Sequence, residues 1–306
     1  MKTGGTFTQN LKRELCGAES DGPEGSRCGS CGLCELYGAL LFGHTFSREN
    51  IRFHTGSRGV AARIAELYRQ NVGREPLRVR ASGYVIAPGE AGLPYLLSAL
   101  PHSFDAVTLR LDARALGPKC CRAAFLRGVF LACGYMSDPA RGYLMEFSTP
   151  HYSLCGDLRI FLEECELSPA RSVRNSLHTL SFKGSEAIED LLATMGAMQT
   201  FYAFTDVRIL RELRNNANRV ANCEASNIDR AVAAASGQLE DARLIARLGH
   251  LDRLPAPLRE AAEMRLARPA LSLEELGAAM SPPLGKSGMR HRMKKLSEYA
   301  ADLRKN

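Results

Sequence analysis

The sequence predicts an α+β domain built from two similar halves, followed by an all-α helix-turn-helix domain. Three observations indicate this fold class: a pattern of helices and strands that repeats over residues 33–197, a polar helical stretch after it, and two short helical patterns joined by a tight turn near the end. We therefore predict a duplicated domain over residues 1–202, a helical linker over 203–250 and a helix-turn-helix domain over 251–306.

The two halves of the duplicated domain, about 33–102 and 118–200, are offset by about ninety positions. Each begins with an apolar helix rich in small residues and continues through a hairpin, an amphipathic helix, a second strand pair and a final helix. The first helices align through Gly38 and Gly128. The amphipathic helices are expected at 59–68 and 152–164, the second strand pairs at 78–80 with 84–86 and 172–174 with 179–181, and the final helices at 91–100 and 185–195.

This arrangement resembles the LAGLIDADG homing endonuclease fold. The resemblance implies that the two glycine-containing helices pack face to face across a pseudo-two-fold axis, with Gly38 and Gly128 allowing their backbones to approach closely. The alternative is that each glycine is merely tolerated in its helix, at a cost of about 1 kcal/mol relative to alanine. Recurrence at matching repeat positions favours the packing role.

The same resemblance identifies the positions at which a homing endonuclease holds its divalent cation, an acidic residue five positions after each glycine. Those positions are Gly43 and Cys133 here, and neither offers the oxygen ligand that magnesium requires. The nearby acids, Glu35 and Asp138, lie at the wrong ends of the motifs. We therefore expect a protein that is not an enzyme and that binds no cofactor.

A basic stripe on the predicted sheets would give the duplicated domain a DNA-binding surface of its own. Little of the chain's excess positive charge falls in residues 1–202, so scattered solvent-facing strand positions are the favoured interpretation. The candidates for such a stripe are Arg52, Arg78, Arg80, Arg171 and Arg174.

The helix-turn-helix pattern near the end of the chain carries most of the net charge. Ser272 and Glu275 form the signature of a capping box before a short apolar face. After a turn at 281–286, apolar residues recur at helical spacing and basic residues fall on the opposite side. The segment 281–306 holds seven Lys and Arg against two acids, so +5 of the chain's +7 lies here, as expected of an element that contacts phosphates.

We predict that the second helix of this motif enters the major groove of double-stranded DNA at its N-terminal end. Ser287 is expected to cap the helix and to contact a phosphate. Lys286 and Lys295 are expected to meet the backbone, and the polar face to meet bases. The alternative is a solvated C-terminal helix. The predicted DNA-binding residues are Lys286, Ser287, Arg290, His291, Arg292, Lys294 and Lys295.

Two further segments leave alternatives open. The linker is dense in Arg and Asn between residues 206 and 227, which suits interdomain hydrogen bonds, phosphate contact or an exposed connector. Cys28, Cys31 and Cys34 have a C-x-x-C spacing that suits zinc or an iron-sulfur cluster, with Cys16 as a candidate fourth ligand. Without a metal, these cysteines are small buried side chains.

Four stretches carry a further resemblance: residues 120–132, 206–227, 254–260 and 281–292. They resemble the bacterial WhiA family of sporulation and cell-division regulators, which joins a degenerate LAGLIDADG domain to a helix-turn-helix similar to sigma-factor region 4. The resemblance implies a DNA-binding transcriptional regulator of cell division, chromosome segregation or sporulation. The alternatives are an interaction module that docks on RNA polymerase or on another regulator or division protein, and a divergent nuclease.

The beginning of the sequence and its apolar runs bear on location. Residues 1–15 lack the apolar region of a signal peptide, and no run approaches the ~18 apolar residues of a membrane span. We expect a cytoplasmic, nucleoid-associated protein without membrane contact, whose ten cysteines are reduced thiols or metal ligands.

Overall fold

The computed structural model describes residues 5–17, 28–80, 83–104, 108–112 and 116–305. The chain divides into two compact units, Met1–Glu212 and Leu213–Asn306. Their boundary falls inside one continuous helix, α8 (Met198–Arg247), which also contains most of the predicted linker. The domain limits at residues 202 and 250 therefore remain a prediction.

The first unit confirms the predicted duplication. After α1 (Phe7–Gly17), both halves follow the order helix, two strands, helix, two strands, helix. The first half contains α2 (Cys31–Leu41), β1 (Thr45–Phe46), β2 (Ile51–Thr55), α3 (Arg58–Val72), β3 (Leu77–Arg80), β4 (Tyr84–Ala87) and α4 (Leu93–Ala99). The second contains α5 (Lys119–Cys133), β5 (Gly134–Met136), β6 (Met145–Thr149), α6 (Tyr152–Glu164), β7 (Ala170–Arg174), β8 (Leu177–Phe182) and α7 (Ser185–Met195).

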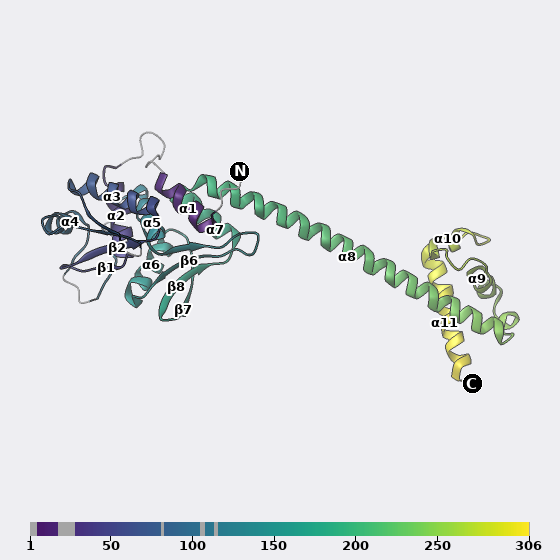
Figure 1. Cartoon of the computed structure of the whole chain (residues 1–306). Helices are drawn as coiled ribbons and strands as arrows, with labels where there is room; N and C mark the ends of the chain where they lie inside the picture. The colour runs from purple at the N-terminus through teal and green to yellow at the C-terminus, as the bar shows by residue number, and fades with distance from the viewer. Residues whose placement is uncertain (1–4, 18–27, 81–82, 105–107, 113–115, 306) are drawn as a thin grey trace. The chain divides into compact units, whose positions relative to one another are not determined.

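Each half forms its own antiparallel sheet, and the two sheets share one topology. Their strand orders are β1-β2-β4-β3 and β5-β6-β8-β7. Figure 1 shows the strands of both sheets on one side of α2, α3 and α5. Because side chains alternate along a strand, the inward residues such as Phe53 and Phe147 are buried in one continuous core with the helices.

The signature helices α2 and α5 pack closely because each carries a glycine where they meet. A Cβ atom on Gly38 would overlap the carbonyl oxygen of Phe125, and one on Gly128 would overlap the carbonyl oxygen of Glu35. No larger residue fits at either position unless a helix backbone moves. The packing role predicted for the two glycines is confirmed.

Glu35, which precedes the first glycine, is buried between α2, α3 and α5. Arg63 of α3 donates to its carboxylate through two nitrogens, at 2.8 Å to Oε1 and 2.9 Å to Oε2. Arg127 of α5 adds a contact of 3.3 Å to Oε2. Glu35 is 1% exposed, and this carboxylate raises the pKa of Arg63. One buried charge therefore ties three helices together.

The second unit has a separate core. It contains the end of α8, a short 3-10 helix (Leu251–Arg253), α9 (Ala256–Ala267), α10 (Leu273–Ala278) and α11 (Lys286–Lys305). The buried Arg265 of α9 donates to the carbonyl oxygen of Leu271 and to Gln238 Oε1, both at 2.7 Å. Burial lowers the pKa of Arg265. No helix within the described residues is long and apolar enough to cross a membrane.

Candidate nucleic-acid interface

The C-terminal ends of α2 and α5 place Gly43 and Cys133 where homing endonucleases carry acidic residues. A Cβ atom at Gly43 would lie 3.0 Å from the Ala39 carbonyl oxygen and 3.2 Å from the Phe53 ring, so even a small side chain would be tight. The Cys133 thiol donates to the Val129 carbonyl oxygen at 3.4 Å, and burial raises its pKa to about 12. Neither position presents a hard oxygen ligand.

A lysine lies close to the second of these positions. Lys12 of α1 donates to the Leu131 carbonyl oxygen at 3.0 Å, and burial lowers the pKa of Lys12. Its ammonium group also interacts with the Cys133 thiol. A positive charge here opposes the binding of a divalent cation.

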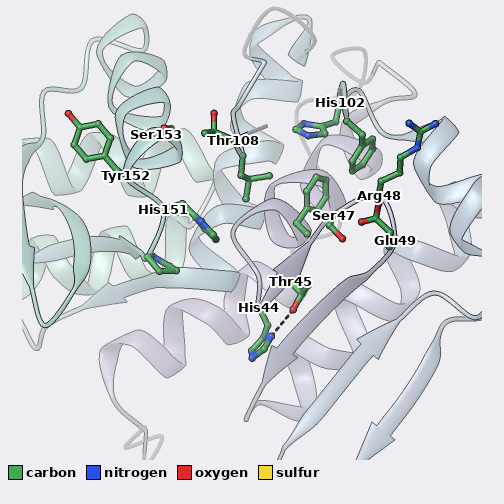
Figure 2. A pocket seen from close by; sticks show the side chains of 14 residues that line it. His44, Thr45, Ser47, Arg48, Glu49, His102, Thr108, His151, Tyr152 and Ser153 are labelled. Atoms are coloured by element: carbon green, nitrogen blue, oxygen red, sulfur yellow. Dashed lines mark hydrogen bonds between the residues drawn. The ribbon is translucent and has the colours of Figure 1, made fainter. Parts of the chain in front are cut away.

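A polar cavity of about 870 Å³ lies at the junction of the two halves of the first unit. Figure 2 shows that its walls come from the segment after α2, the connector between the halves and the start of α6. His44 hydrogen-bonds Thr45 at 2.9 Å, and His102 hydrogen-bonds the Tyr37 hydroxyl at 2.9 Å. Among the lining residues that the structure describes, Glu49 is the one carboxylate.

Strand register separates the five arginines proposed for a basic stripe. Arg78 pairs with Ile86, and Arg171 pairs with Leu180, so both lie on the core side of their sheets at the edge strands. Arg52 lies between the buried residues Ile51 and Phe53 and faces solvent. Arg174 is exposed and lies on the opposite face of its strand from Arg171. The side chain of Arg80 lies outside the described part of the chain. The four arginines whose side chains are described therefore form no single stripe on one face.

The helix-turn-helix is built by α10, α11 and the turn between them. The Ser272 side chain accepts from the Glu275 amide at 3.3 Å, and the Glu275 carboxylate accepts from the Ser272 amide at 2.8 Å, so the predicted capping box is present. Gly277 allows the turn to approach α10, because a Cβ atom there would overlap the Leu284 carbonyl oxygen. The Leu284 amide in turn donates to the Gly277 carbonyl oxygen at 2.8 Å.

One face of α11 enters the core of the second unit and fixes which side chains face solvent. Its buried residues are Met289, Met293, Leu296 and Ala300, as the helical spacing predicts. Lys286, Ser287, Arg290, His291, Lys294 and Lys295 are exposed. Among the described residues, no ion pair engages Lys286, Arg290 or Lys295. Lys294 lies 3.7 Å from Glu298.

Two of the predicted contact residues have different positions from those expected. α11 begins at Lys286, and the Met289 amide bonds to the Gly285 carbonyl oxygen at 3.1 Å, so Ser287 is inside the first turn and does not cap the helix. Arg292 points toward α9, where it donates to the Pro257 carbonyl oxygen at 3.2 Å and lies 3.5 Å from Glu260. Arg292 lies three residues after Met289 and four before Leu296, so it borders the buried face of α11.

The cysteine run is only partly brought together. Cys28 and Cys31 join Cys120 and Cys121 of α5, and all four sulfur atoms lie within 4.8 Å of one another. The Cys121 thiol lowers the pKa of Cys28 to about 7 through a hydrogen bond. Among the described residues, neither Cys34 nor Cys16 belongs to this group, and the ligand set expected from the sequence stays a prediction.

Sequence reasoning missed Cys120, Cys121 and the ion pairs of Glu35. The repeat could have indicated Cys121, because the offset that aligns Gly38 with Gly128 also aligns Cys31 with Cys121. The Arg- and Asn-rich stretch lies in α8. Near its start, Arg208 donates to Glu189 Oε1 at 2.9 Å and Arg211 donates to the Pro139 carbonyl oxygen at 3.3 Å, whereas residues 212–227 are exposed.

The fold and the two sites define a class of protein: a LAGLIDADG-like domain without the acidic signature residues, joined to a helix-turn-helix domain. Residues 122–214 match the family described as "WhiA LAGLIDADG-like domain", and residues 217–300 match "WhiA C-terminal HTH domain".

Relatives along the full length support the same family. The chain is 32% identical over 319 residues to "Probable cell division protein WhiA" of Ruminiclostridium cellulolyticum, covering 98% of this chain and 99% of the relative. A relative of the same name from Clostridium novyi is 32% identical over 314 residues, with 98% and 99% covered. The chain belongs to the WhiA family.

A solved structure shows the shared fold. The crystal structure of full-length DUF199/WhiA from Thermotoga maritima superposes with a TM-score of 0.57 at 22% sequence identity. The match covers 97% of this chain and 99% of that one.

Proposed function

We propose that this protein is a non-catalytic, sequence-specific DNA-binding regulator of transcription that acts in cell division, and that α11 reads its DNA site. The observation that carries the proposal is the exposed basic face at the N-terminal end of α11, next to the turn. In a helix-turn-helix, that end of the second helix contacts base edges. The name of the relatives, probable cell division protein, supports the cellular process. Sporulation and chromosome segregation are further processes within the proposal.

The exposed residues divide by their place on the helix. Arg290, His291 and Lys294 lie on the outward face and are assigned to bases or to the edge of the groove. Lys286 and Lys295 are assigned to phosphates, because a flexible ammonium group serves as a point charge. Arg292 is assigned a structural role instead, since its guanidinium is engaged with α9.

The absence of catalysis is part of the same proposal. Gly43 and Cys133 replace the two acidic ligands that would hold a catalytic cation, and Lys12 adds positive charge beside Cys133. The duplicated domain is then a scaffold or a surface for a partner.

The test begins with selection of bound sequences from a random duplex library by the full-length chain. Fluorescence anisotropy then compares a selected duplex with a scrambled one across a salt titration. Arg290→Ala should lose about 1–3 kcal/mol of discrimination between the two duplexes. Lys295→Ala should weaken both duplexes alike and lower the salt slope by about one.

Lys305→Ala is the matched control, because Lys305 is an exposed lysine at the far end of α11, 3.5 Å from Asp302. It should leave discrimination unchanged. If Arg290→Ala and Lys295→Ala both bind the two duplexes as the wild type does at every salt concentration, α11 is not the DNA-binding element. Docking of this unit on RNA polymerase would then be favoured.

A further inference from the structure

Four cysteine side chains meet at the N-terminal ends of the two signature helices. Cys31 is the first residue of α2 and Cys28 lies three residues earlier, while Cys120 and Cys121 are in the first turn of α5. The Cys28 sulfur lies 2.9 Å from that of Cys121, 3.6 Å from that of Cys120 and 3.7 Å from that of Cys31. The Cys28 sulfur thus lies next to the other three.

We propose that these four cysteines bind one zinc ion as thiolates. Zinc with four thiolate ligands is tetrahedral with Zn–S distances of about 2.3 Å, which separates the sulfurs by about 3.8 Å. All four sulfurs here lie within 4.8 Å of one another. An iron-sulfur cluster holds its thiolates farther apart because two or more irons lie between them, so the compact group fits a single ion.

The chemistry of the ligands selects the metal. Thiolates are soft ligands that favour zinc over the oxygen-preferring magnesium, calcium or manganese. A four-thiolate site has no open position for water, so the ion is structural and not catalytic. A structural ion at the N-terminal ends of α2 and α5 needs no acidic residues at Gly43 and Cys133, which lie at the opposite ends of these helices.

Backbone hydrogen bonds hold two of the four cysteines in the first turns of their helices. The Cys31 amide donates to the Cys28 carbonyl oxygen at 3.3 Å, and the Cys121 amide donates to the Pro118 carbonyl oxygen at 2.9 Å. Zinc with four thiolates carries a net charge of minus two. The N-terminal ends of α2 and α5 carry positive partial charge, which stabilises thiolates there.

The position in the repeat explains what the ion would do. Cys31 and Cys121 occupy equivalent positions in the two halves, seven residues before Gly38 and Gly128. The ion would therefore join the duplicated halves at one end of the interface that the glycines close. It requires no DNA and is independent of the function proposed for α11.

The experiment measures metal in the full-length chain purified under reducing conditions without chelators. Elemental analysis should give about one zinc ion per chain and little iron, and X-ray absorption should give four sulfur neighbours at about 2.3 Å. Because these measurements use the wild-type chain, they do not depend on whether a variant folds.

Variants then assign the ligands. Cys28→Ser and Cys121→Ser should each lose most of the zinc. Cys155→Ser is the matched control, since Cys155 is also buried in the first unit but lies outside the four-sulfur group. It should retain the ion, and so should Cys34→Ser.

Three results would overturn the proposal. One is a wild-type chain without metal in which all ten cysteines titrate as free thiols. Another is a disulfide between Cys28 and Cys121 in the metal-free chain under the same reducing conditions. The third is zinc that remains at full occupancy in both Cys28→Ser and Cys121→Ser, which would place the ion elsewhere.

Discussion

Replacing Glu35 by glutamine tests how the two signature helices and α3 are held together. The change keeps the shape of the side chain and removes its charge, which leaves Arg63 and Arg127 without their carboxylate. These arginines are only 15% and 12% exposed, so water compensates them poorly. Breaking a buried ion pair by removing one partner costs about 3–5 kcal/mol.

This loss of stability corresponds to a lower Tm, which calorimetry can measure. For a unit of this size, 1 kcal/mol corresponds to about 2–4 °C in Tm. Glu35→Gln should therefore lower the Tm of the transition that belongs to the first unit by roughly 10 °C. The transition of the second unit should stay in place, because that unit has a separate core.

Glu66→Gln supplies the control. Glu66 also pairs with an arginine, Arg69, at 2.5 Å, but both side chains are 41% or more exposed. Exposed ion pairs are screened by water and contribute little, so the Tm should scarcely move. Equal shifts in Tm for Glu35→Gln and Glu66→Gln would refute the claim that the buried ion pairs of Glu35 stabilise the first unit.

Four other outcomes follow from the structure. Gly128→Ala should destabilise the first unit by about 1–3 kcal/mol in denaturant unfolding, whereas Gly156→Ala, with open space around its Cα, should be neutral or stabilising by up to about 1 kcal/mol. Plasmid DNA incubated with the protein and magnesium or manganese should stay intact on a gel, and cleavage that persists after repurification would count against the reasoning. Burial lowers the pKa of His102 below its ordinary value of 6.5, so only the unfolded chain gains the proton as the pH falls through that value. Stability should therefore fall below pH 6.5 more steeply in the wild type than in His102→Gln, and parallel curves would contradict this. Arg292→Ala should lower the Tm of the second unit without changing the salt slope of DNA binding. An unchanged Tm with a lower salt slope would instead indicate that Arg292 contacts DNA.

The architecture could be predicted because its determinants are local. Helical spacing, the capping box at Ser272 and the repeated glycines are each visible within a few residues, and the structure has the corresponding elements. The exposed face of α11 followed from the same spacing, since placing Met289 and Met293 in the core leaves Arg290 and Lys294 outside.

The remaining features depend on contacts between distant segments. Nothing near Glu35 in the sequence indicates that Arg63 and Arg127 will meet it, because those contacts arise only when three helices pack. Cys28 meets Cys121 for the same reason. The error at Ser287 was of a different kind: the end of a helix varies by one or two residues, and α11 begins one residue before Ser287.

A genome-wide DNA-occupancy map, made for the wild-type chain and for Arg290→Ala, tests the central claim most directly. If α11 reads DNA, the wild type should occupy discrete sites that share a sequence motif. The variant should lose these sites while its cellular level stays the same. Occupancy that lacks a common motif and follows RNA polymerase equally in both chains would contradict the claim.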